Sequence, residues 1–577
     1  MMSPFHRHDL RPLVRSMALL YGSRADHCME RLSMMAGRYG LGYPQPAQPY
    51  RWTQRDAVLI TYGDMVRDPA EHPLVALREC LNVVGGDAFN TVHILPFFPS
   101  SSDDGFSVVH FRRVDPELGQ WADVQELGKR YRLMVDLVLN HASRQSGWFK
   151  DFELGISPAR DYFITADQAF DVSQVVRPRS HPVLTPVQTR EGRRQVWTTF
   201  STDQVDLDFS NPDVLFELLD ILLYYIAMGA RIIRLDAIAY LWKRSGTTCI
   251  HLDETHEVVK VMREVVEMLA PDTILLTETN VPHAENVSYF GQGDEAHMVY
   301  QFSLPPLLLH ALVKGDARHL SQWAASLAPP PEGCTFLNFT ASHDGIGVRP
   351  LQGLVSAFEL DDVILHVKNC GGQVSMKRNS DNTESPYELN ITWFDAMSGA
   401  SDEAQEMHFR RFICSQAVPL ALQGIPAVYF HALTATPNDV DGVTRSGRAR
   451  SINRHKWTKS DLMARLGDAG SNQAKAVTEI RRLLELRSRH PAFHPDGPQR
   501  VLQIDERVFA VERTAPDGSE IVVALHNLTP QAVELGGEAF SVEGNNDLIQ
   551  NKKLKSGKGG LRLDPYQVMW LARSTAR

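Results

Sequence analysis

Short apolar runs alternate with helix-forming segments along most of the chain from residue 57 onward. The intervening segments, such as VLFELLDILLYYIAMGA and HEVVKVMREVVEMLA, place apolar residues at the spacing of an amphipathic helix. Strands that alternate with helices are typical of α/β proteins with a parallel sheet, and eight such runs predict a (β/α)8 TIM barrel. An open, doubly wound sheet is the alternative. The apolar runs are residues 57–64, 91–97, 132–141, 231–237, 273–279, 297–303, 335–344 and 426–431.

Three regions depart from this alternation. Residues 1–52 carry apolar side chains at helical spacing before the proline-rich stretch GYPQPAQPY, so we expect an N-terminal helical extension. The expected barrel, residues 53–495, contains two intervals too long for a single helix, which predict inserted subdomains at about 143–205 and 345–425. Short strand-like runs separated by turns predict a small all-β C-terminal domain over residues 496–577.

The composition is that of a globular protein, because 43% of the 577 residues are hydrophobic and 22% are charged. The formal net charge of −10 gives no support to a nucleic-acid partner, and an anionic ligand needs a local cationic pocket. Six cysteines without a CxxC pair indicate free thiols in a reducing compartment. No run has transmembrane length or the features of a secretory leader, so we expect a cytoplasmic protein without a membrane partner. The oligomeric state is left open, with a homodimer as one option.

Polar side chains end several of the predicted strands, which is where barrel enzymes carry their catalytic groups. A single carboxylate there is more often a cap or a salt-bridge partner, but several buried carboxylates at one mouth require a functional reason. For Asp136, a structural hydrogen-bond network is an equal alternative to substrate contact, and His343 alone fits a core histidine. The strand-end set is Asp136, Asn140, His141, Arg234, Asp236, Glu278, His343 and Asp344.

Paired carboxylates at a barrel mouth suit glycoside chemistry. A retaining glycosidase uses one carboxylate as nucleophile and a second carboxyl group as acid and base, about 5 to 5.5 Å apart. Arg234 precedes Asp236 by two residues, so the two share one face of the strand, where the guanidinium favours the ionised form of Asp236. We expect burial and neighbouring carboxylates to raise the pKa of Glu278, so that it holds a proton for the leaving oxygen.

Four short segments carry a family resemblance: DLVLNH (136–141), RIIRLDAIAY (231–240), LLTETN (275–280) and FTASHD (339–344). Together they resemble the signature regions of the α-amylase-type glycoside hydrolase superfamily. Further stretches resemble the sucrose-phosphorylase branch of that superfamily, and the similarity runs from about residue 56 to the C-terminus. These stretches are HILPFFPSSSDDGFSV, RPRSHPVLTP, VWTTFSTDQVDLDFSNP, YQFSLPPLLLHAL, SHDGIGVRPL and SINRHKW.

The resemblance implies roles for individual residues. Asp236 matches the nucleophile, Glu278 the general acid/base and Asp344 the transition-state stabiliser. Arg177 and Tyr387 match positions that handle phosphate or the acceptor, although the RPR stretch that holds Arg177 also fits a solvated basic turn. The residues placed around the glucosyl ring are Asp103, Phe106, His141, Arg234, His343 and Arg454.

The implied reaction is a double displacement with retention of configuration. Asp236 forms a β-glucosyl-enzyme, Glu278 protonates the departing alcohol, and inorganic phosphate then attacks to give α-glucose 1-phosphate. Phosphate is a co-substrate and no cofactor is expected. No metal is expected either, because Asn140, a calcium ligand in many amylases, has no such duty in this branch.

The resemblance leaves the identity of the departing alcohol open. The N-terminal extension and the 380s loop resemble the glucosylglycerol and glucosylglycerate phosphorylases. Because Glu384 and Glu388 flank Tyr387, we expect a neutral acceptor, and hence a phosphorylase of 2-O-α-D-glucosylglycerol. Two cationic residues close in sequence, Lys377 and Arg378, favour a negatively charged acceptor, so glucosylglycerate is the alternative substrate. Sucrose and sucrose 6'-phosphate follow as further alternatives. A hydrolase or transglucosidase is the rival activity, and a catalytically inactive sugar-binding protein the rival class.

Overall fold

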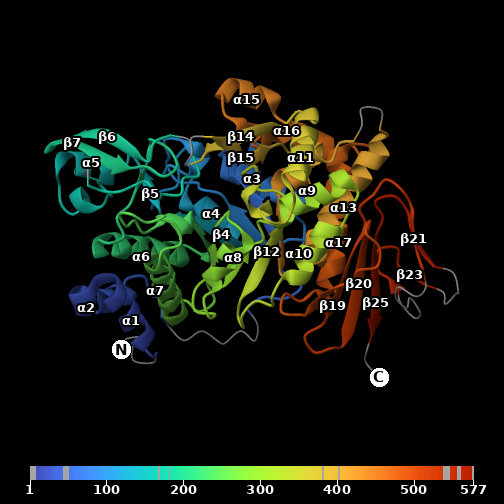
Figure 1. Cartoon of the computed structure of the whole chain (residues 1–577), viewed down its shortest axis with the longest axis horizontal. Coiled ribbons are helices and arrows are strands. Elements are labelled where there is room, and N and C mark those ends of the chain that lie inside the picture. The colour runs from blue at the N-terminus through green and yellow to red at the C-terminus, as the bar shows by residue number, and fades with distance from the viewer. Residues whose placement is uncertain are drawn as a thin grey trace.

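The fold is that of a closed parallel barrel, as seen in a computed structural model of the chain (Figure 1). The structure describes residues 8–42, 51–166, 169–179, 181–379, 383–399, 403–536, 546–554 and 560–574. The strands lie in the order β1-β16-β12-β11-β10-β9-β4-β3, and pairing of β1 with both β16 and β3 closes the barrel. The barrel strands are β1 (Val58–Thr61), β3 (Thr91–Ile94), β4 (Arg132–Val138), β9 (Ala230–Asp236), β10 (Ile274–Thr277), β11 (Met298–Tyr300), β12 (Thr335–Phe339) and β16 (Ile425–Tyr429).

Each predicted apolar run coincides with one barrel strand, although β9 and β16 begin one residue before their runs. The barrel prediction is therefore confirmed, and the sheet is closed, not open. The strands are buried on both faces because helices cover the outside of a parallel barrel, which explains their continuous apolar sequences. The helices between and after the strands are α3 (Pro73–Val84), α4 (Trp121–Gly128), α6 (Pro212–Ala227), α7 (Asp253–Leu269), α8 (His283–Val287), α9 (Leu304–Lys314), α10 (Arg318–Ser326), α11 (Ala357–Asn369), α12 (Trp393–Ala396), α13 (Gln405–Ala421), α14 (Phe430–Leu433), α15 (Val440–Ser446), α16 (Lys459–Gly467) and α17 (Asn472–Ser488).

Local sequence signals begin these helices. At α6 the Asn211 side chain accepts a hydrogen bond from the Asp213 backbone N–H, and Pro212 occupies the first turn, where its missing N–H costs nothing. At α11, Ser356 and Glu359 form a reciprocal capping box. The caps therefore set where two of the outer helices start.

The first long interval, between β4 and α6, holds β5 (His141–Ser143), α5 (Gly147–Leu154), β6 (Leu184–Thr189), β7 (Gly192–Trp197) and β8 (Gln204–Asp206). The second, between β12 and β16, contains a three-stranded sheet of β13 (Ile346–Gly347), β15 (Glu384–Asn390) and β14 (Gln373–Arg378). Figure 1 shows β6, β7, β14 and β15 along the same end of the barrel. Residues 380–382, at the tip of the 380s loop, lie outside the described ranges.

Two helices precede the barrel, α1 (Arg11–Tyr21) and α2 (Ala25–Ala36). Ser16 donates a hydrogen bond to Glu257 on α7 at 2.6 Å, and Tyr39 donates to Asp220 on α6 at 2.9 Å, so the extension packs on the barrel helices. Most of the proline-rich stretch GYPQPAQPY lies outside the described residues.

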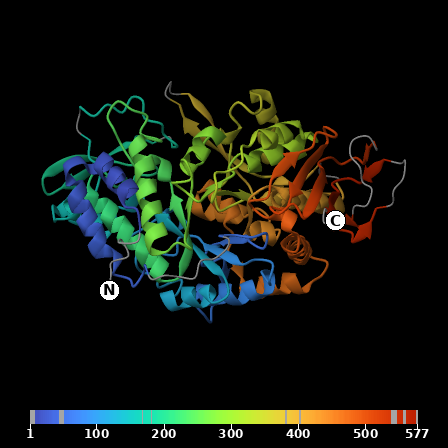
Figure 2. The same cartoon turned by 90° about the horizontal axis from the view of Figure 1, so that it is seen from below.

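The C-terminal region is a sheet of six strands: β18 (Gln499–Val501), β19 (Val508–Thr514), β20 (Glu520–Asn527), β25 (Val568–Ser574), β22 (Asn546–Asp547) and β23 (Lys552–Lys553). A separate pair joins β21 (Val533–Leu535) to β24 (Leu561–Leu563). This sheet and the N-terminal helices lie on opposite sides of the barrel in both views (Figures 1 and 2). Within the described part of the chain, no helix combines the length and apolarity that a membrane crossing requires.

Candidate active site

A pocket at the C-terminal ends of the barrel strands collects the predicted polar residues. Of the predicted residues, Arg177 and Arg454 do not line it, and neither do Asp136 and Asn140 of the strand-end set. Both insertions contribute to its wall, because Arg179 comes from the first and Tyr387 from the second. The lining consists of Asp103, Phe106, His141, Arg179, Phe200, Gln204, Arg234, Asp236, Ala237, Glu278, Asn280, His343, Asp344, Tyr387 and Arg450.

The register of β9 and β10 brings the two central carboxylates together. Leu235 pairs with Thr277 in the parallel ladder, so the next residues, Asp236 and Glu278, end neighbouring strands at the same level. The Glu278 backbone N–H donates to the Leu235 carbonyl at 3.1 Å, which continues the ladder to the mouth. Barrel geometry thus produces the carboxylate pair that the sequence predicted.

Arg234 is the shared cation of this mouth. Its Nη1 donates to Asp236 Oδ1 at 2.6 Å and to Asp136 Oδ1 at 2.5 Å, and its side chain is only 3% exposed. The second oxygen of Asp136 lies 2.6 Å from His93 Nε2. Because Asp136 is fully paired below the pocket and does not line it, the structure favours the network reading of this residue.

The two central carboxyl groups differ in their pKa values. Burial raises the pKa of Asp236, but the direct Arg234 ion pair opposes that shift and keeps Asp236 the more acidic of the two. Burial, with the charges of Asp236 and Asp344, raises the pKa of Glu278 to about 7, although Arg234 opposes the rise. The pair therefore combines a carboxylate with a carboxyl group that holds its proton near neutral pH.

Asp344 has the opposite environment. Burial by itself raises a carboxyl pKa, but the nearby charges of Arg450 and Arg454 lower the pKa of Asp344 below its ordinary value. Arg450 Nη1 lies 2.6 Å from Asp344 Oδ1, and Arg454 Nη2 lies 3.9 Å from the same oxygen. Asp344 is therefore a permanent negative charge facing the pocket.

Arg454 lies behind the pocket wall. It donates through Nε to the His343 carbonyl at 3.0 Å and forms an ion pair with Asp104. The His343 ring stacks on Phe106, with centroids 4.8 Å apart and an interplanar angle of 6°. Burial lowers the pKa of His343, so its ring is neutral. Arg454 thus positions the loop that carries His343 and Asp344.

Arg179, and not the predicted Arg177, lines the pocket. The Arg179 guanidinium lies 5.7 Å from the centre of the Phe200 ring and 5.6 Å from that of Tyr387. Arg177 instead donates to the His181 carbonyl at 3.4 Å. The RPR stretch contained both arginines, but only the fold of the first insertion shows which of them reaches the pocket.

Gln204 and Arg450 are further pocket residues that the sequence reasoning missed. Gln204 donates to Asp103 Oδ2 at 3.3 Å and lies 3.1 Å from His141 Nε2, which ties β8 to the part of the pocket wall that these two residues form. Gln204 belongs to the stretch VWTTFSTDQVDLDFSNP, and Arg450 directly precedes SINRHKW, so proximity to these motifs was the available signal.

A lysine ammonium lies beside Asn140. Lys243 Nζ is 3.3 Å from Asn140 Oδ1 and 2.7 Å from Asp206 Oδ2, and Asn140 also donates to Asp206 at 3.1 Å. The protein's own cation therefore neutralises the Asp206 carboxylate at this position.

Comparison with known proteins identifies the class of enzyme whose fold this chain shares. The family model "Alpha amylase, catalytic domain" matches residues 81–326. The crystal structure of sucrose 6F-phosphate phosphorylase from Thermoanaerobacter thermosaccharolyticum superposes with a TM-score of 0.72 at 24% sequence identity, covering 83% of this chain and 96% of that one. The fold is thus shared with an α-amylase-type enzyme.

Two relatives with named activities show which branch of the superfamily the chain resembles. The glucosylglycerate phosphorylase of Allomeiothermus silvanus is 45% identical over 97% of this chain and 98% of its own. The glucosylglycerol phosphorylase of Marinobacter adhaerens is 30% identical over 75% of this chain and 87% of its own. The chain belongs to the α-amylase-type superfamily and, within it, to the glycoside phosphorylases of the sucrose-phosphorylase branch, which confirms the resemblance read from its motifs.

Proposed function

We propose that this phosphorylase cleaves an α-glucosylglycerate, using inorganic phosphate to release α-D-glucose 1-phosphate and D-glycerate in a reversible reaction. The relative from Allomeiothermus silvanus supports glycerate, since it shares 45% identity over nearly the whole chain, against 30% for the glucosylglycerol enzyme. The alternative that the sequence left open is therefore better supported than the neutral acceptor we expected first.

The observation that carries the proposal is the position of Arg179. It lines the pocket that holds Asp236, Glu278 and Asp344, and among the described residues it forms no ion pair with a carboxylate. With Asp103 the pocket has four acidic residues, and such a pocket repels an anion unless a cation compensates. The Arg179 guanidinium offers a fork of donors that matches a carboxylate or a phosphate.

Because the reaction retains configuration, glycerate and phosphate bind in the same subsite. In a double displacement the leaving alcohol departs from the face of the sugar that phosphate later attacks, so both occupy one subsite in turn. A subsite that accepts phosphate must already be cationic. Glycerate, which carries a carboxylate, suits that subsite better than glycerol does.

Glu388 does not oppose an anionic acceptor. Its side chain is buried, and it accepts hydrogen bonds from Arg450 Nε at 3.0 Å and from Arg450 Nη2 at 2.6 Å. Its charge is therefore neutralised, whereas Glu384 is exposed. Lys377 lies on the neighbouring strand β14, outside the residues that line the pocket.

The roles follow from the charge states of the three acids. Asp236, held ionised by Arg234, attacks the anomeric carbon, and Glu278 gives its proton to the departing oxygen. Asp344 supplies fixed negative charge for the oxocarbenium-like transition state. In the second half, Glu278 accepts the proton of phosphate. No calcium ion is required beside Asn140, because Lys243 supplies the positive charge there.

The experiment that tests the proposal is an acceptor screen in the synthetic direction. The enzyme is given α-glucose 1-phosphate with D-glycerate, glycerol, fructose or fructose 6-phosphate, and phosphate release is measured. We expect D-glycerate to react with the highest kcat/KM. Glycerol reacting as well as glycerate would overturn the acceptor assignment, and glucose release that ignores the acceptor would identify a hydrolase.

A further inference from the structure

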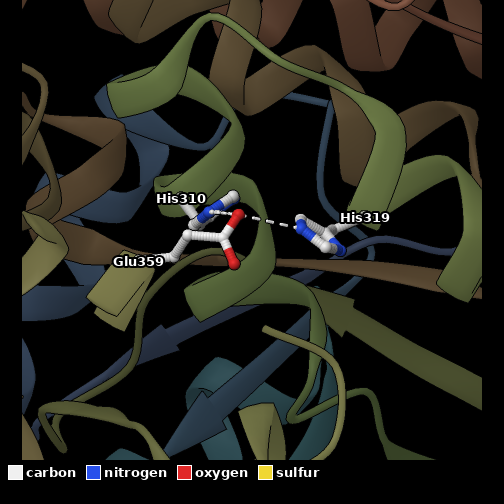
Figure 3. A group of neighbouring side chains, drawn as sticks. All are labelled: His310, His319 and Glu359. Atoms are coloured by element: carbon white, nitrogen blue, oxygen red, sulfur yellow. Dashed lines mark hydrogen bonds and ion pairs between the residues drawn. The ribbon is translucent and has the colours of Figure 1, made fainter. Parts of the chain in front are cut away.

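A cluster of potential metal ligands lies outside the active-site pocket, on three helices of the outer layer. His310 belongs to α9, His319 to α10 and Glu359 to α11. Figure 3 shows the Glu359 carboxylate between the two imidazole rings. Glu359 Oε1 lies 3.6 Å from His310 Nε2 and 3.0 Å from His319 Nε2, and one ligand atom from each residue lies within 4.8 Å of the others.

The buried member of this cluster lacks hydrogen bonds. His310 is 1% exposed, and among the described residues neither of its ring nitrogens has a hydrogen-bond partner. A polar group removed from water without a partner costs about 1–3 kcal/mol, so such groups are rare in proteins unless another ligand satisfies them. The Glu359 oxygen, 3.6 Å away, is too distant for a hydrogen bond.

The spacing of the ligand atoms fits a transition-metal ion. Zinc binds imidazole nitrogen and carboxylate oxygen at about 2.0–2.2 Å, so two ligands of a tetrahedral ion lie about 3.3 Å apart. Glu359 Oε1 lies 3.0 Å from His319 Nε2 and 3.6 Å from His310 Nε2, on either side of that value. An ion bound between these atoms would give His310 Nε2 the partner that it lacks.

The carboxylate is already oriented for such a role. Glu359 Oε2 accepts hydrogen bonds from the Ser356 backbone N–H at 2.9 Å and from its hydroxyl at 2.7 Å, which leaves Oε1 directed at the histidines. Hydrogen bonds of this kind hold metal-binding carboxylates in other proteins. His319 and Glu359 are 29% and 27% exposed, so an ion and a water ligand can reach the cluster from solvent.

Nearby cations are neutralised by other carboxylates. Lys314 lies 2.7 Å from Asp362, and Arg318 lies 2.5 Å from Asp316. Neither of these cations pairs with Glu359.

We propose that His310, His319 and Glu359 bind one zinc ion, which joins α9, α10 and α11 and takes water as its fourth ligand. The site has a structural role, because it is separate from the pocket that holds the catalytic acids. The expectation of no metal rested on Asn140 at the barrel mouth, and these residues could not be grouped from the sequence because they lie on different helices.

Zinc binding to the full-length enzyme tests the proposal. After treatment with a chelator, the protein is titrated with zinc by calorimetry and with cobalt by absorption spectroscopy. We expect one zinc per chain, a rise in the thermal unfolding midpoint, and cobalt bands of a tetrahedral site. His319→Ala and Glu359→Gln should each weaken binding about tenfold or more; Glu359→Gln keeps an oxygen for the helix cap.

Two controls separate this site from adventitious binding. His27→Ala removes an exposed histidine, and Cys370→Ser removes the thiol that lies 3.6 Å from His366. Both variants should bind zinc like the wild type. Zinc affinity that is unchanged in His319→Ala and Glu359→Gln, or that is lost in Cys370→Ser, would overturn the assignment, as would the absence of any zinc-dependent rise in the unfolding midpoint.

Discussion

Glu278 accepts a hydrogen bond from the backbone N–H of Ala237 at 3.1 Å. Ala237 directly follows Asp236 and adopts the left-handed conformation, with φ 53° and ψ 31°. This conformation costs a non-glycine residue roughly 1–2 kcal/mol, so the surrounding structure must hold it. One main-chain turn thus connects the proposed nucleophile to the proposed acid and fixes their relative position.

The pKa of Glu278 predicts the pH dependence of the first step. A carboxyl group with a pKa raised to about 7 is protonated below that pH and loses its proton above it. The kcat/KM for the glucoside should therefore fall about tenfold per pH unit above 7. Steady-state rates from pH 5 to 9 measure this. The fluoride of α-glucosyl fluoride leaves without needing a proton, so with this substrate kcat/KM should not fall above pH 7. A fall that persisted with this substrate would exclude Glu278 as the acid.

Asp236→Asn should abolish turnover. The amide keeps the shape of the side chain but cannot form a glucosyl ester, so we expect kcat to fall by about four orders of magnitude. The thermal unfolding midpoint and the circular dichroism spectrum are the controls for folding. Turnover within about tenfold of the wild type would assign the nucleophile to another residue.

Arg179→Ala and Arg177→Ala form a matched pair. Only Arg179 lines the pocket, and a lost charge-assisted hydrogen bond costs about 1.5–3 kcal/mol. We expect KM for phosphate and for D-glycerate to rise about 10- to 100-fold in Arg179→Ala. In Arg177→Ala both constants should change less than about twofold. Equal effects of the two substitutions would contradict the anion-binding role of Arg179.

Glu388→Gln and Glu384→Gln separate a buried ion pair from an exposed charge. Glu388 pairs with Arg450, which also lies 2.6 Å from Asp344. Removing the buried charge should destabilise the fold by about 1–3 kcal/mol, because the amide accepts a weaker hydrogen bond. Glu384 is exposed, and its substitution should change stability by less than about 0.5 kcal/mol. Urea unfolding midpoints measure the stability of both variants. An unchanged midpoint in Glu388→Gln would contradict the neutralisation of Glu388 by Arg450.

Much of the barrel and of its mouth was predictable from the sequence. The eight barrel strands follow from apolar runs that alternate with helical spacing, and each strand starts within one residue of its run. Strand-end placement then marked four acidic residues as candidates, Asp136, Asp236, Glu278 and Asp344, because parallel strands of a barrel all end at one mouth. The family resemblance assigned the catalytic roles to the last three, and these three line the pocket. The acceptor side was less predictable, since Arg177 and Arg179 stand two residues apart in an irregular insertion with no period to orient them.

What the sequence by itself determined is therefore local: periodicity, strand direction and the residue types that end each strand. Tertiary structure alone decided which charges from distant segments meet. Glu388 looked like an acid facing the acceptor, but Arg450, 62 residues later, neutralises it. His310 and Glu359 likewise meet only because α9 packs against α11. Such pairings depend on how distant segments pack together, and no repeat within a single segment encodes them.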